Sequence, residues 1–300
     1  MVKQIFAKRL SIVFLNYNKL AETKQTIERL SQICANKQEI EIIAVDNGSS
    51  DGTAEYLKNQ TVAKAILLEE NTGIAGYNKG FQEATGQYYL VLDDDSCPQN
   101  MDSVEKMMMV LDEHNEIGII ACHIESPDGT AQSSWHLPQT ASFGPSPFFV
   151  GCGFIIRSDL FRSINWYPDS FFLYQNEVDI AFKVRQKGYQ IFYAPDCVVT
   201  HRGIPSRRPG WRRVYYPTRN TIWLIQRYYP QPQASYMIAS RLVIGLVRAI
   251  QFRQLINYYR AVKDAFKQRP GKQKACADVL KESEAFWRQN SIFHYLFRMN

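Results

Sequence analysis

The sequence contains no uninterrupted apolar run of the about eighteen residues that a membrane-spanning helix requires. The best candidate, residues 237–250, is interrupted by Arg241 and Arg248. None of the six cysteines forms a CxxC pair, which argues against a disulfide framework or a zinc site and favours reduced thiols in a cytosolic protein. No GxGxxG follows the first predicted strand, so a dinucleotide-binding dehydrogenase is also disfavoured.

The two parts of the chain differ in charge: basic residues are the minority in residues 1–201, and acidic residues are few in residues 202–300. Residues 1–201 carry 16 Lys/Arg against 25 Asp/Glu, a net charge of −9, whereas residues 202–300 carry 19 against 4, a net charge of +15. A basic segment attracts the phosphates of nucleic acids, nucleotides or lipid headgroups. We do not expect nucleic acid as a partner, because the sequence contains no recognisable nucleic-acid-binding motif.

Strand and helix patterns alternate over the first hundred residues. Continuous apolar runs predict strands at 11–18, 41–50, 65–70 and 88–92, and helical spacing predicts helices at 20–34, 53–58 and near 80–84. Later segments predict strands at 117–125, 148–157 and 189–199, a helix at 177–187, a loop at 202–217 and then further helices. This alternation favours an α/β fold with a mostly parallel central sheet flanked by helices.

Polar residues follow all four of the first predicted strands. Asn16 to Asn18, Asp46 to Ser50, Asn71 to Gly73 and Asp93 to Asp95 occupy these four strand exits. Ligands of parallel α/β sheets bind at the carboxyl ends of the strands, where these exits meet. Turn chemistry alone explains any one of them, but their coincidence favours a ligand site.

Six segments, taken in order, resemble the family 2 glycosyltransferases and lie closest to their bacterial rhamnosyltransferase-like branch. They are SIVFLNYN, AVDNGSSDGT, NTGIAGYNKG, LDDDS, GCGFIIR and YQNEVDIAFKVRQKGY, and they cover about the first two-thirds of the chain. The resemblance implies the GT-A fold and inverting transfer of a sugar from a nucleoside diphosphate. It further implies a catalytic domain over 1–205, with a nucleotide-binding half (1–96) and an acceptor-side half (97–205), followed by a loop and helical extension over 206–300.

The resemblance also implies roles for the strand-exit residues. Asp93 and Asp95 match the DxD motif, in which the first aspartate touches the donor ribose and the last binds Mn²⁺ or Mg²⁺ that bridges the diphosphate. Oxygen ligands suit such hard cations, so a cation turns the crowding of carboxylates into a binding site. Asp46 matches the aspartate that binds a uracil or thymine base. The remaining donor-binding candidates are Asn16, Tyr17, Asn71, Gly73, Asn78 and Asp94.

The segment YQNEVD carries the predicted catalytic base. The family has Glu-Asp here with the aspartate as base, whereas this chain has Asn176-Glu177, so the resemblance implies a glutamate base, Glu177. Such a base removes the proton of the acceptor hydroxyl. An alternative stays open, in which Asn176 caps the helix and Glu177 and Asp179 only complement its dipole.

Residues after the last predicted strand are candidates for the metal and the diphosphate. His201 stands at the strand end, where it is either a metal ligand with Asp93 and Asp95 or an ordinary polar residue. In the loop that follows, Arg202, Arg207 and Arg208 are candidates for the diphosphate, and Trp211 for the acceptor. A solvated basic loop without a ligand is the alternative.

The basic tail contains an amphipathic pattern. If residues 237–267 form one helix, its cations fall on one arc: Arg241, Arg248, Arg253, Arg260, Lys263 and Lys267. Such a helix either lies on an anionic membrane or packs its apolar side on the catalytic domain with the cations in water. We favour the membrane, and so expect a cytoplasmic protein with peripheral contact at the inner face of the plasma membrane.

The predicted function is the transfer of a sugar from UDP or dTDP to a hydroxyl of a glycan or a lipid-linked acceptor, in cell-surface polysaccharide synthesis. Two alternatives remain. One is a non-catalytic sugar-nucleotide binding protein, which the Asn176-Glu177 departure keeps open. The other is a phosphotransferase with Asp93 as the nucleophile, but that class has its aspartate pair after the first strand, and three strands precede it here.

Overall fold

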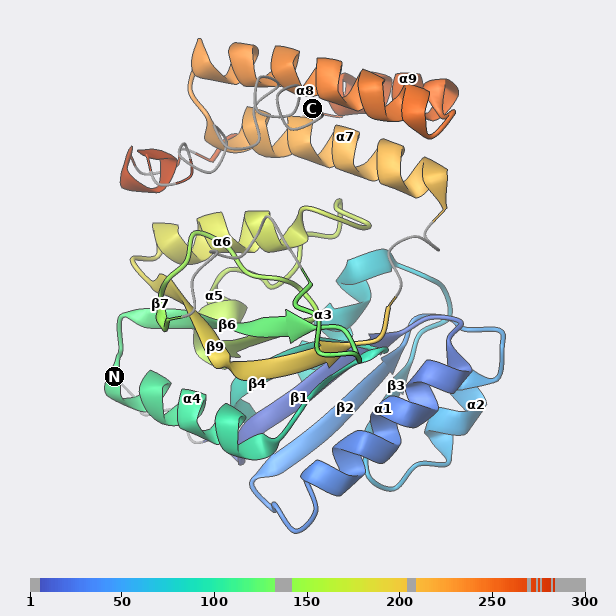
Figure 1. Ribbon diagram of the computed structural model, residues 1–300, viewed down its shortest axis with the longest axis vertical. Coiled ribbons are helices and arrows are strands. Elements are labelled where there is room, and N and C mark those ends of the chain that lie inside the picture. Colours follow the sequence, from blue (N-terminus) through green and yellow to red (C-terminus); the bar gives the residue numbers. More distant parts are fainter. Residues whose placement is uncertain are drawn as a thin grey trace. The chain divides into compact units, whose positions relative to one another are not determined.

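The computed structural model describes residues 6–132, 142–203, 209–268, 271–273, 275, 277–281 and 283. The chain folds into two compact units, each of which makes most of its contacts internally (Figure 1). Unit 1 comprises Met1–Phe172 and Asn176–Gly203, and unit 2 comprises Leu173–Gln175 and Ile204–Asn300.

Unit 1 begins with four parallel strands: β1 (Lys8–Asn16), β2 (Ile40–Asp46), β3 (Lys64–Leu67) and β4 (Gly86–Asp93). They lie in the order β3-β2-β1-β4. The connections contain α1 (Leu20–Ile33), α2 (Thr53–Lys58), the 3₁₀ turn η1 (Gly73–Gly76) and α3 (Tyr77–Glu83). The strand β1 lies between β2 and β4, so the chain first adds strands on one side of β1 and then on the other. Ligand sites of α/β sheets form at the carboxyl ends of the strands where the strand order reverses in this way.

The second half of unit 1 extends the same sheet. The strand β8 (Gly153–Arg157) pairs antiparallel with β4, β6 (Ile117–Glu125) pairs antiparallel with β8, and β9 (Gln190–His201) runs parallel to β6. Two short strands, β5 (Ser96–Pro98) and β7 (Gly144–Pro145), pair antiparallel with β9. The helices of this half are α4 (Met101–Glu113), α5 (Ser158–Ser163) and α6 (Asn176–Gln186). The predicted α/β sheet flanked by helices is confirmed.

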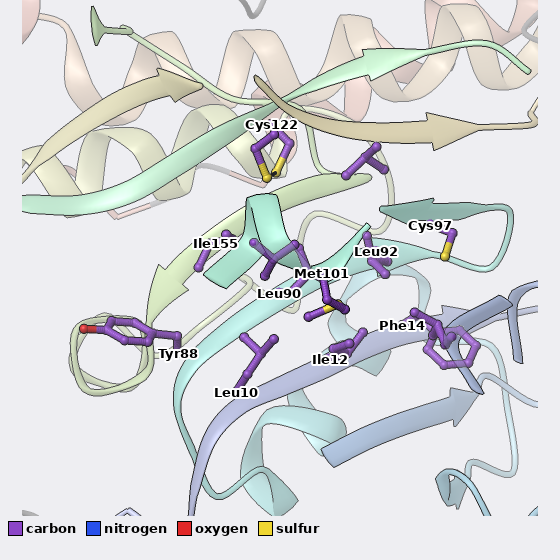
Figure 2. Close-up of a cluster of buried hydrophobic side chains, with 14 of the residues drawn as sticks. Leu10, Ile12, Phe14, Tyr88, Leu90, Leu92, Cys97, Met101, Cys122 and Ile155 are labelled. Atoms are coloured by element: carbon purple, nitrogen blue, oxygen red, sulfur yellow. Dashed lines mark hydrogen bonds between the residues drawn. The ribbon is translucent and has the colours of Figure 1, made fainter. Parts of the chain in front are cut away.

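The core explains why the strand ends are held in place. Residues Leu10, Ile12 and Phe14 alternate along β1 and lie in register with the buried side chains Tyr88, Leu90 and Leu92 of β4 (Figure 2). These side chains belong to a buried cluster that includes Met101 of α4 and Leu30 of α1. Burying each such side chain contributes roughly 1.5–3 kcal/mol, so the strands that carry the polar exits are rigid.

Three helices in the described part of unit 2 pack against one another: α7 (Gly210–Tyr228), α8 (Gln233–Gln251) and α9 (Leu255–Lys267). In the part of the chain that the structure describes, no helix combines the length and the apolarity needed to cross a bilayer.

Two sequence predictions about element bounds are wrong. The segment 202–217 is not a loop throughout, because α7 begins at Gly210 and contains Pro217. The buried residues Val214, Thr218 and Ile222 recur at helical spacing, and their packing outweighs the lost hydrogen bond at the proline. Residues 148–152 are buried or partly buried but lie outside β8, which starts at Gly153.

The predicted single helix over residues 237–267 is also wrong. It is interrupted at Phe252–Gln254, where Arg253 adopts a left-handed conformation (φ 54°) and Gln254 N–H donates to Ala249 O over 2.7 Å. This is the six-to-one bond of a Schellman motif, which ends a helix. The cations therefore do not share one helical arc. Arg241 is partly buried, and burial lowers its pKa to about 10, while Val243, Leu246 and Ile250 of the same helix are exposed.

Candidate functional site

The parallel register brings the polar strand ends together. Asn16 of β1 lies opposite Asp46 of β2, and Leu15 lies opposite Asp93 of β4. Asn16 is fully buried, and its amide donates to Val45 O (3.1 Å) and accepts from Thr23 Oγ1 (2.8 Å). Asn16 thus ties β1 to β2 and α1.

Asp46 has an oxygen without a partner. Its side chain is 1% exposed, and Oδ2 accepts from the Ser49 N–H over 2.9 Å. Its Oδ1 is buried and accepts no hydrogen bond from any described residue. Leaving a buried acceptor unpaired costs about 1–3 kcal/mol, so an N–H donor supplied by a ligand fits this position.

Asn47 organises the loop that follows β3. Its Nδ2 donates to Asn71 Oδ1 (3.1 Å) and Gly73 O (2.9 Å), and its Oδ1 accepts from the Thr72 N–H (3.0 Å). Asn71 Oδ1 in turn accepts from the Gly73 N–H over 2.8 Å. The second and third strand exits therefore form one hydrogen-bonded rim.

The acidic triplet lies beside this rim. Asp93 Oδ1 accepts from the Tyr77 hydroxyl (3.0 Å), and Asp94 and Asp95 are buried. The ammonium of Lys19 lies between the latter two, 2.9 Å from Asp94 Oδ1 and 2.6 Å from Asp95 Oδ2. A cationic group is thus already bound by these two carboxylates.

Burial and neighbouring charges shift the pKa values of the two buried carboxyl groups, Asp94 and Asp95, in opposite directions. Burial raises the pKa of Asp94 to about 7, although the Lys19 ammonium opposes this shift. Burial also acts to raise the pKa of Asp95, but the His201 hydrogen bond and the Lys19 charge outweigh it and hold that pKa well below its usual range. Asp95 is therefore the carboxylate that stays ionised and suited to a cation.

His201 is oriented by Gln132. The Gln132 amide Nε2 donates to His201 O over 2.9 Å, which leaves Gln132 Oε1 to accept from His201 Nδ1, also over 2.9 Å. With the proton on Nδ1, the other nitrogen, Nε2, faces Asp95 Oδ1 over 3.2 Å. A neutral histidine would place two acceptors against each other there, so the pair requires either a second proton on the ring or a cation.

Glu177 lies in the first turn of α6 and reaches the same region. A Cβ added to Gly151 would lie 2.6 Å from Glu177 Oε1. The Cys152 thiol is fully buried, and burial, together with the charges of Asp93, Asp95 and Glu177, raises its pKa well above the ordinary value. The structure therefore gathers three carboxylates around Cys152.

The donor atoms present fit a hard divalent cation. Ligand atoms of Asp93, Cys152 and His201 lie within 4.8 Å of one another, and Asp95 adjoins His201. Because the Cys152 thiol stays protonated, the carboxylates and the imidazole are the competent ligands, and such a set suits Mn²⁺ or Mg²⁺. A Cβ at Gly203 would lie 2.6 Å from His201 Nε2 and 3.0 Å from Asp95 Oδ2, so the glycine leaves this space open.

A family model described as Glycosyl transferase family 2 matches residues 11–180. The chain belongs to glycosyl transferase family 2. The match contains the whole rim, the acidic triplet and Glu177, while His201 lies beyond it.

Relatives of this family 2 chain include an undecaprenyl-phosphate 4-deoxy-4-formamido-L-arabinose transferase of Yersinia enterocolitica. It is 33% identical over 124 residues, which are 39% of this chain and 38% of that relative, so the match spans well under half of the relative's length.

Solved structures confirm the GT-A-type fold of this family 2 chain. S. aureus TarS 1–349 in complex with UDP-GlcNAc has a TM-score of 0.60 at 18% identity, covering 87% of this chain and 82% of that one. The mannosyltransferase PcManGT from Pyrobaculum calidifontis, in complex with GDP-Man and Mn²⁺, has a TM-score of 0.59 at 16% identity, covering 90% and 80%.

Several of the predicted site residues of the family 2 chain make hydrogen bonds to other parts of the protein. Arg202 donates to Glu22 Oε2 (2.7 Å) and Thr26 Oγ1 (2.7 Å), which anchors the end of β9 on α1. Asn78 bonds both backbone groups of Tyr167, N–H at 3.1 Å and O at 2.9 Å. Tyr17 is exposed, and only its backbone N–H is directed at Asp94 Oδ2, over 3.5 Å.

Three further residues named in the sequence analysis lie on helices α6 and α7. Trp211 belongs to α7 of unit 2, where the Arg212 guanidinium lies 5.4 Å from its ring centre, and Arg207 and Arg208 lie outside the described residues. Asn176 does not cap α6: it is the first helical residue, and its side-chain amide has no hydrogen-bond partner among the described residues. Asp179 pairs with Lys183 of the same helix over 2.9 Å.

Four residues of the site were missed from the sequence: Lys19, Asn47, Gln132 and Cys152. Lys19 directly follows the first strand exit and Asn47 lies within the second, so their positions at the same sheet edge were available signals. Gln132 carries no motif, and only the pairing of distant segments reveals its contact with His201. Cys152 was considered only for disulfide or zinc spacing, which does not register a lone buried thiol.

Proposed function

We propose that the protein is a metal-dependent inverting glycosyltransferase that moves a hexosyl or rhamnosyl group from a UDP- or dTDP-sugar to a hydroxyl of a glycan or lipid-linked acceptor, in polysaccharide synthesis. The observation that carries the proposal is the pair of Asp95 Oδ1 and His201 Nε2, two groups 3.2 Å apart that a cation would satisfy. The family supports sugar transfer, and the Yersinia relative is named for a lipid-phosphate acceptor.

The rim residues would bind the donor. The unpartnered Asp46 Oδ1 is suited to accept the N3–H of uracil or thymine, which cytosine lacks. Asp93, oriented by Tyr77, is proposed for the ribose, and Asp94 lies next to it. Asn16, Asn47 and Asn71 hold the strand exits in position around the base.

Asp93, Asp95 and His201 would hold Mn²⁺ or Mg²⁺ against the diphosphate, and Gln132 fixes the imidazole so that Nε2 is available. The chemistry that a bound cation supplies is neutralisation of the charge that develops on the departing nucleoside diphosphate. Glu177 would accept the proton of the acceptor hydroxyl, a contribution of roughly 10²–10⁴ in rate. Packing against the backbone of Gly151 and attachment to the first turn of α6 hold its carboxylate in place.

Thermal unfolding tests the donor and metal site. UDP or dTDP at about 100 times its Kd, together with Mn²⁺, is expected to raise Tm by about 5 °C. Chelation and Asp95→Asn should each abolish most of this shift, whereas Asp128→Asn, an exposed aspartate, should preserve it. An unchanged Tm for the wild-type protein with every nucleotide would contradict the proposal.

A donor panel tests turnover. Incubation with several nucleotide sugars and Mn²⁺ should reveal one that is slowly hydrolysed without acceptor. Glu177→Gln should retain the thermal shift with UDP and Mn²⁺ and lose transfer. If wild type and Glu177→Gln bind the nucleotide equally and neither transfers any sugar, the protein is instead a sugar-nucleotide binding protein, the alternative that the Asn176-Glu177 sequence keeps open.

A further inference from the structure

Exposed large apolar side chains are concentrated on two helices of unit 2. Eight of the 14 such side chains among the described residues fall within 233–267. Their exposed fractions run from 41% for Leu246 to 70% for Ile256. We call this set the apolar face: Tyr236, Val243, Leu246 and Ile250 of α8, and Leu255, Ile256, Tyr259 and Phe266 of α9. A contiguous apolar surface on a protein indicates an interaction site.

On α8, the apolar face points away from the neighbouring helices. Its members recur at intervals of three, four and seven residues, which places them on one side of the helix. The opposite side carries Gly245, where an added Cβ would lie 2.9 Å from Tyr258 of α9 and 3.1 Å from Thr218 of α7. Packing against α7 and α9 therefore uses the other side of α8.

On α9, hydrogen bonds to both neighbouring helices come from residues outside the apolar face. The Tyr258 hydroxyl donates to Leu242 O of α8 (2.7 Å), and Asp264 accepts from the Tyr215 hydroxyl of α7 (2.6 Å). Helical geometry places the exposed residues Leu255, Tyr259 and Phe266 beside Tyr258 and roughly opposite Asp264, so they face away from α7. Figure 1 draws α8 and α9 beside each other on the same side of α7, so their outer sides form one surface.

Cations flank this surface. The exposed residues Arg260, Lys263 and Lys267 lie along α9, and exposed Arg248 and Arg253 lie near the α8–α9 connection. Residues 233–267 contain six Lys/Arg and one acidic residue, a net charge of +5. That acidic residue, Asp264, is the one bound by Tyr215. The surface thus combines exposed apolar side chains with uncompensated positive charge.

We infer that the outer side of α8 and α9 docks on an anionic lipid bilayer. The apolar face would enter the headgroup–acyl boundary, to the depth of roughly 5–10 Å that interfacial helices reach, while the flanking cations bind lipid phosphates. A second copy of this chain is disfavoured, because two such surfaces would place a charge of +5 against +5. This surface differs from the single basic helix expected from the sequence. The apolar sides of two helices would contact the lipid, and Arg241 lies on the packed side of α8 and not among the flanking cations.

Vesicle flotation tests this inference without donor, metal or acceptor, so its outcome is independent of sugar transfer. The full chain is mixed with vesicles of phosphatidylcholine alone or with 40% phosphatidylglycerol, at about 0.1 M salt. We expect flotation with the anionic vesicles only. The double change Ile250→Glu and Tyr259→Glu should weaken binding at least tenfold. Lys263→Gln with Lys267→Gln should weaken it about 25-fold, roughly fivefold per charge.

Matched controls lie on α4 of unit 1. Met109→Glu and Lys106→Gln make the same kinds of change at exposed positions and should leave vesicle binding unaltered. All four variant proteins should keep the wild-type Tm, because the substituted side chains are exposed. Wild-type protein that fails to float, or Glu variants that float as well as wild type, would overturn the inference. Sedimentation that shows a dimer, dissociated by the same Glu variants, would assign the surface to a second copy instead.

Discussion

Glu177 depends on the absence of a side chain at position 151. We expect Gly151→Ala to fold, since its added Cβ would meet only the end of a flexible carboxylate, 2.6 Å away. Glu177 must then move, and a displacement of about 1 Å can reduce the rate roughly 100-fold. Steady-state transfer and the UDP–Mn²⁺ thermal shift should show a lower kcat with unchanged donor binding. Gly144→Ala, where an added Cβ meets nothing within 4 Å, is the control.

Lys19 neutralises the two buried carboxylates when no metal is bound. We expect Lys19→Met to lower the free energy of unfolding by about 1–3 kcal/mol in metal-free buffer, because Asp94 and Asp95 lose their shared donor. The same change should strengthen binding of Mn²⁺ alone, because no ammonium competes for Asp95. Denaturant titration and the electron paramagnetic resonance signal of free Mn²⁺ measure these effects. Lys106→Met, at an exposed position, should change neither, and weaker Mn²⁺ binding by Lys19→Met would contradict the competition.

The types of these residues were easier to predict than their partners. Aspartates and amides at strand exits were recognisable because adjacent parallel strands end at one edge. Partners such as Gln132 for His201, or Glu22 for Arg202, are 69 and 180 residues apart in sequence, so only the folded chain reveals them. Arg202 illustrates this gap, because its charge predicts a diphosphate contact but does not reveal that Glu22 and Thr26 of α1 accept hydrogen bonds from its guanidinium.

At the scale of helices and strands, the short segment Leu173–Gln175, which leads into α6, has a strained backbone. Tyr174 and Gln175 both have left-handed backbones, with φ of 67° and 68°, and Asn220 of α7 donates to Leu173 O (2.8 Å) and Tyr174 O (2.9 Å). Such conformations cost about 1–3 kcal/mol and persist only when neighbours hold them. The buried Asn220 amide provides that support.

Asn220→Ala tests this support. We expect a loss of stability of about 1–3 kcal/mol and a lower kcat, because the segment ends next to Asn176 and Glu177. The KM for donor should not change, since the rim residues are untouched. Thermal unfolding and steady-state kinetics measure the two effects, and Asn59→Ala at an exposed position is the control. A raised donor KM with unchanged kcat would refute this role.

Element types were predictable where one pattern dominated. The strand at 117–125 and the helix at 53–58 have the predicted bounds, because apolar runs and turn residues coincide there. The beginning of α7 was missed because Pro217 and the arginines indicated a loop, and the break after α8 was missed because Arg253 adopts a conformation usually left to glycine.

For the molecule as a whole, charge asymmetry in the sequence indicated two parts, and the structure divides into two units. What charge alone did not indicate was which side of each helix faces water. A helical pattern fixes which residues share a side, but both sides of α8 bear apolar residues, and only the packing of Gly245 against Thr218 and Tyr258 decides between them.

The backbone crosses between the units three times, at Phe172/Leu173, Gln175/Asn176 and Gly203/Ile204. Glu177 is the second residue after the second crossing, and His201 is the third residue from the end of the segment before the last crossing. The group proposed to take up the proton and a group proposed to hold the cation thus each lie within three residues of a peptide connection to the helical unit. Acid–base chemistry and metal ligation are in this sense both covalently adjacent to unit 2.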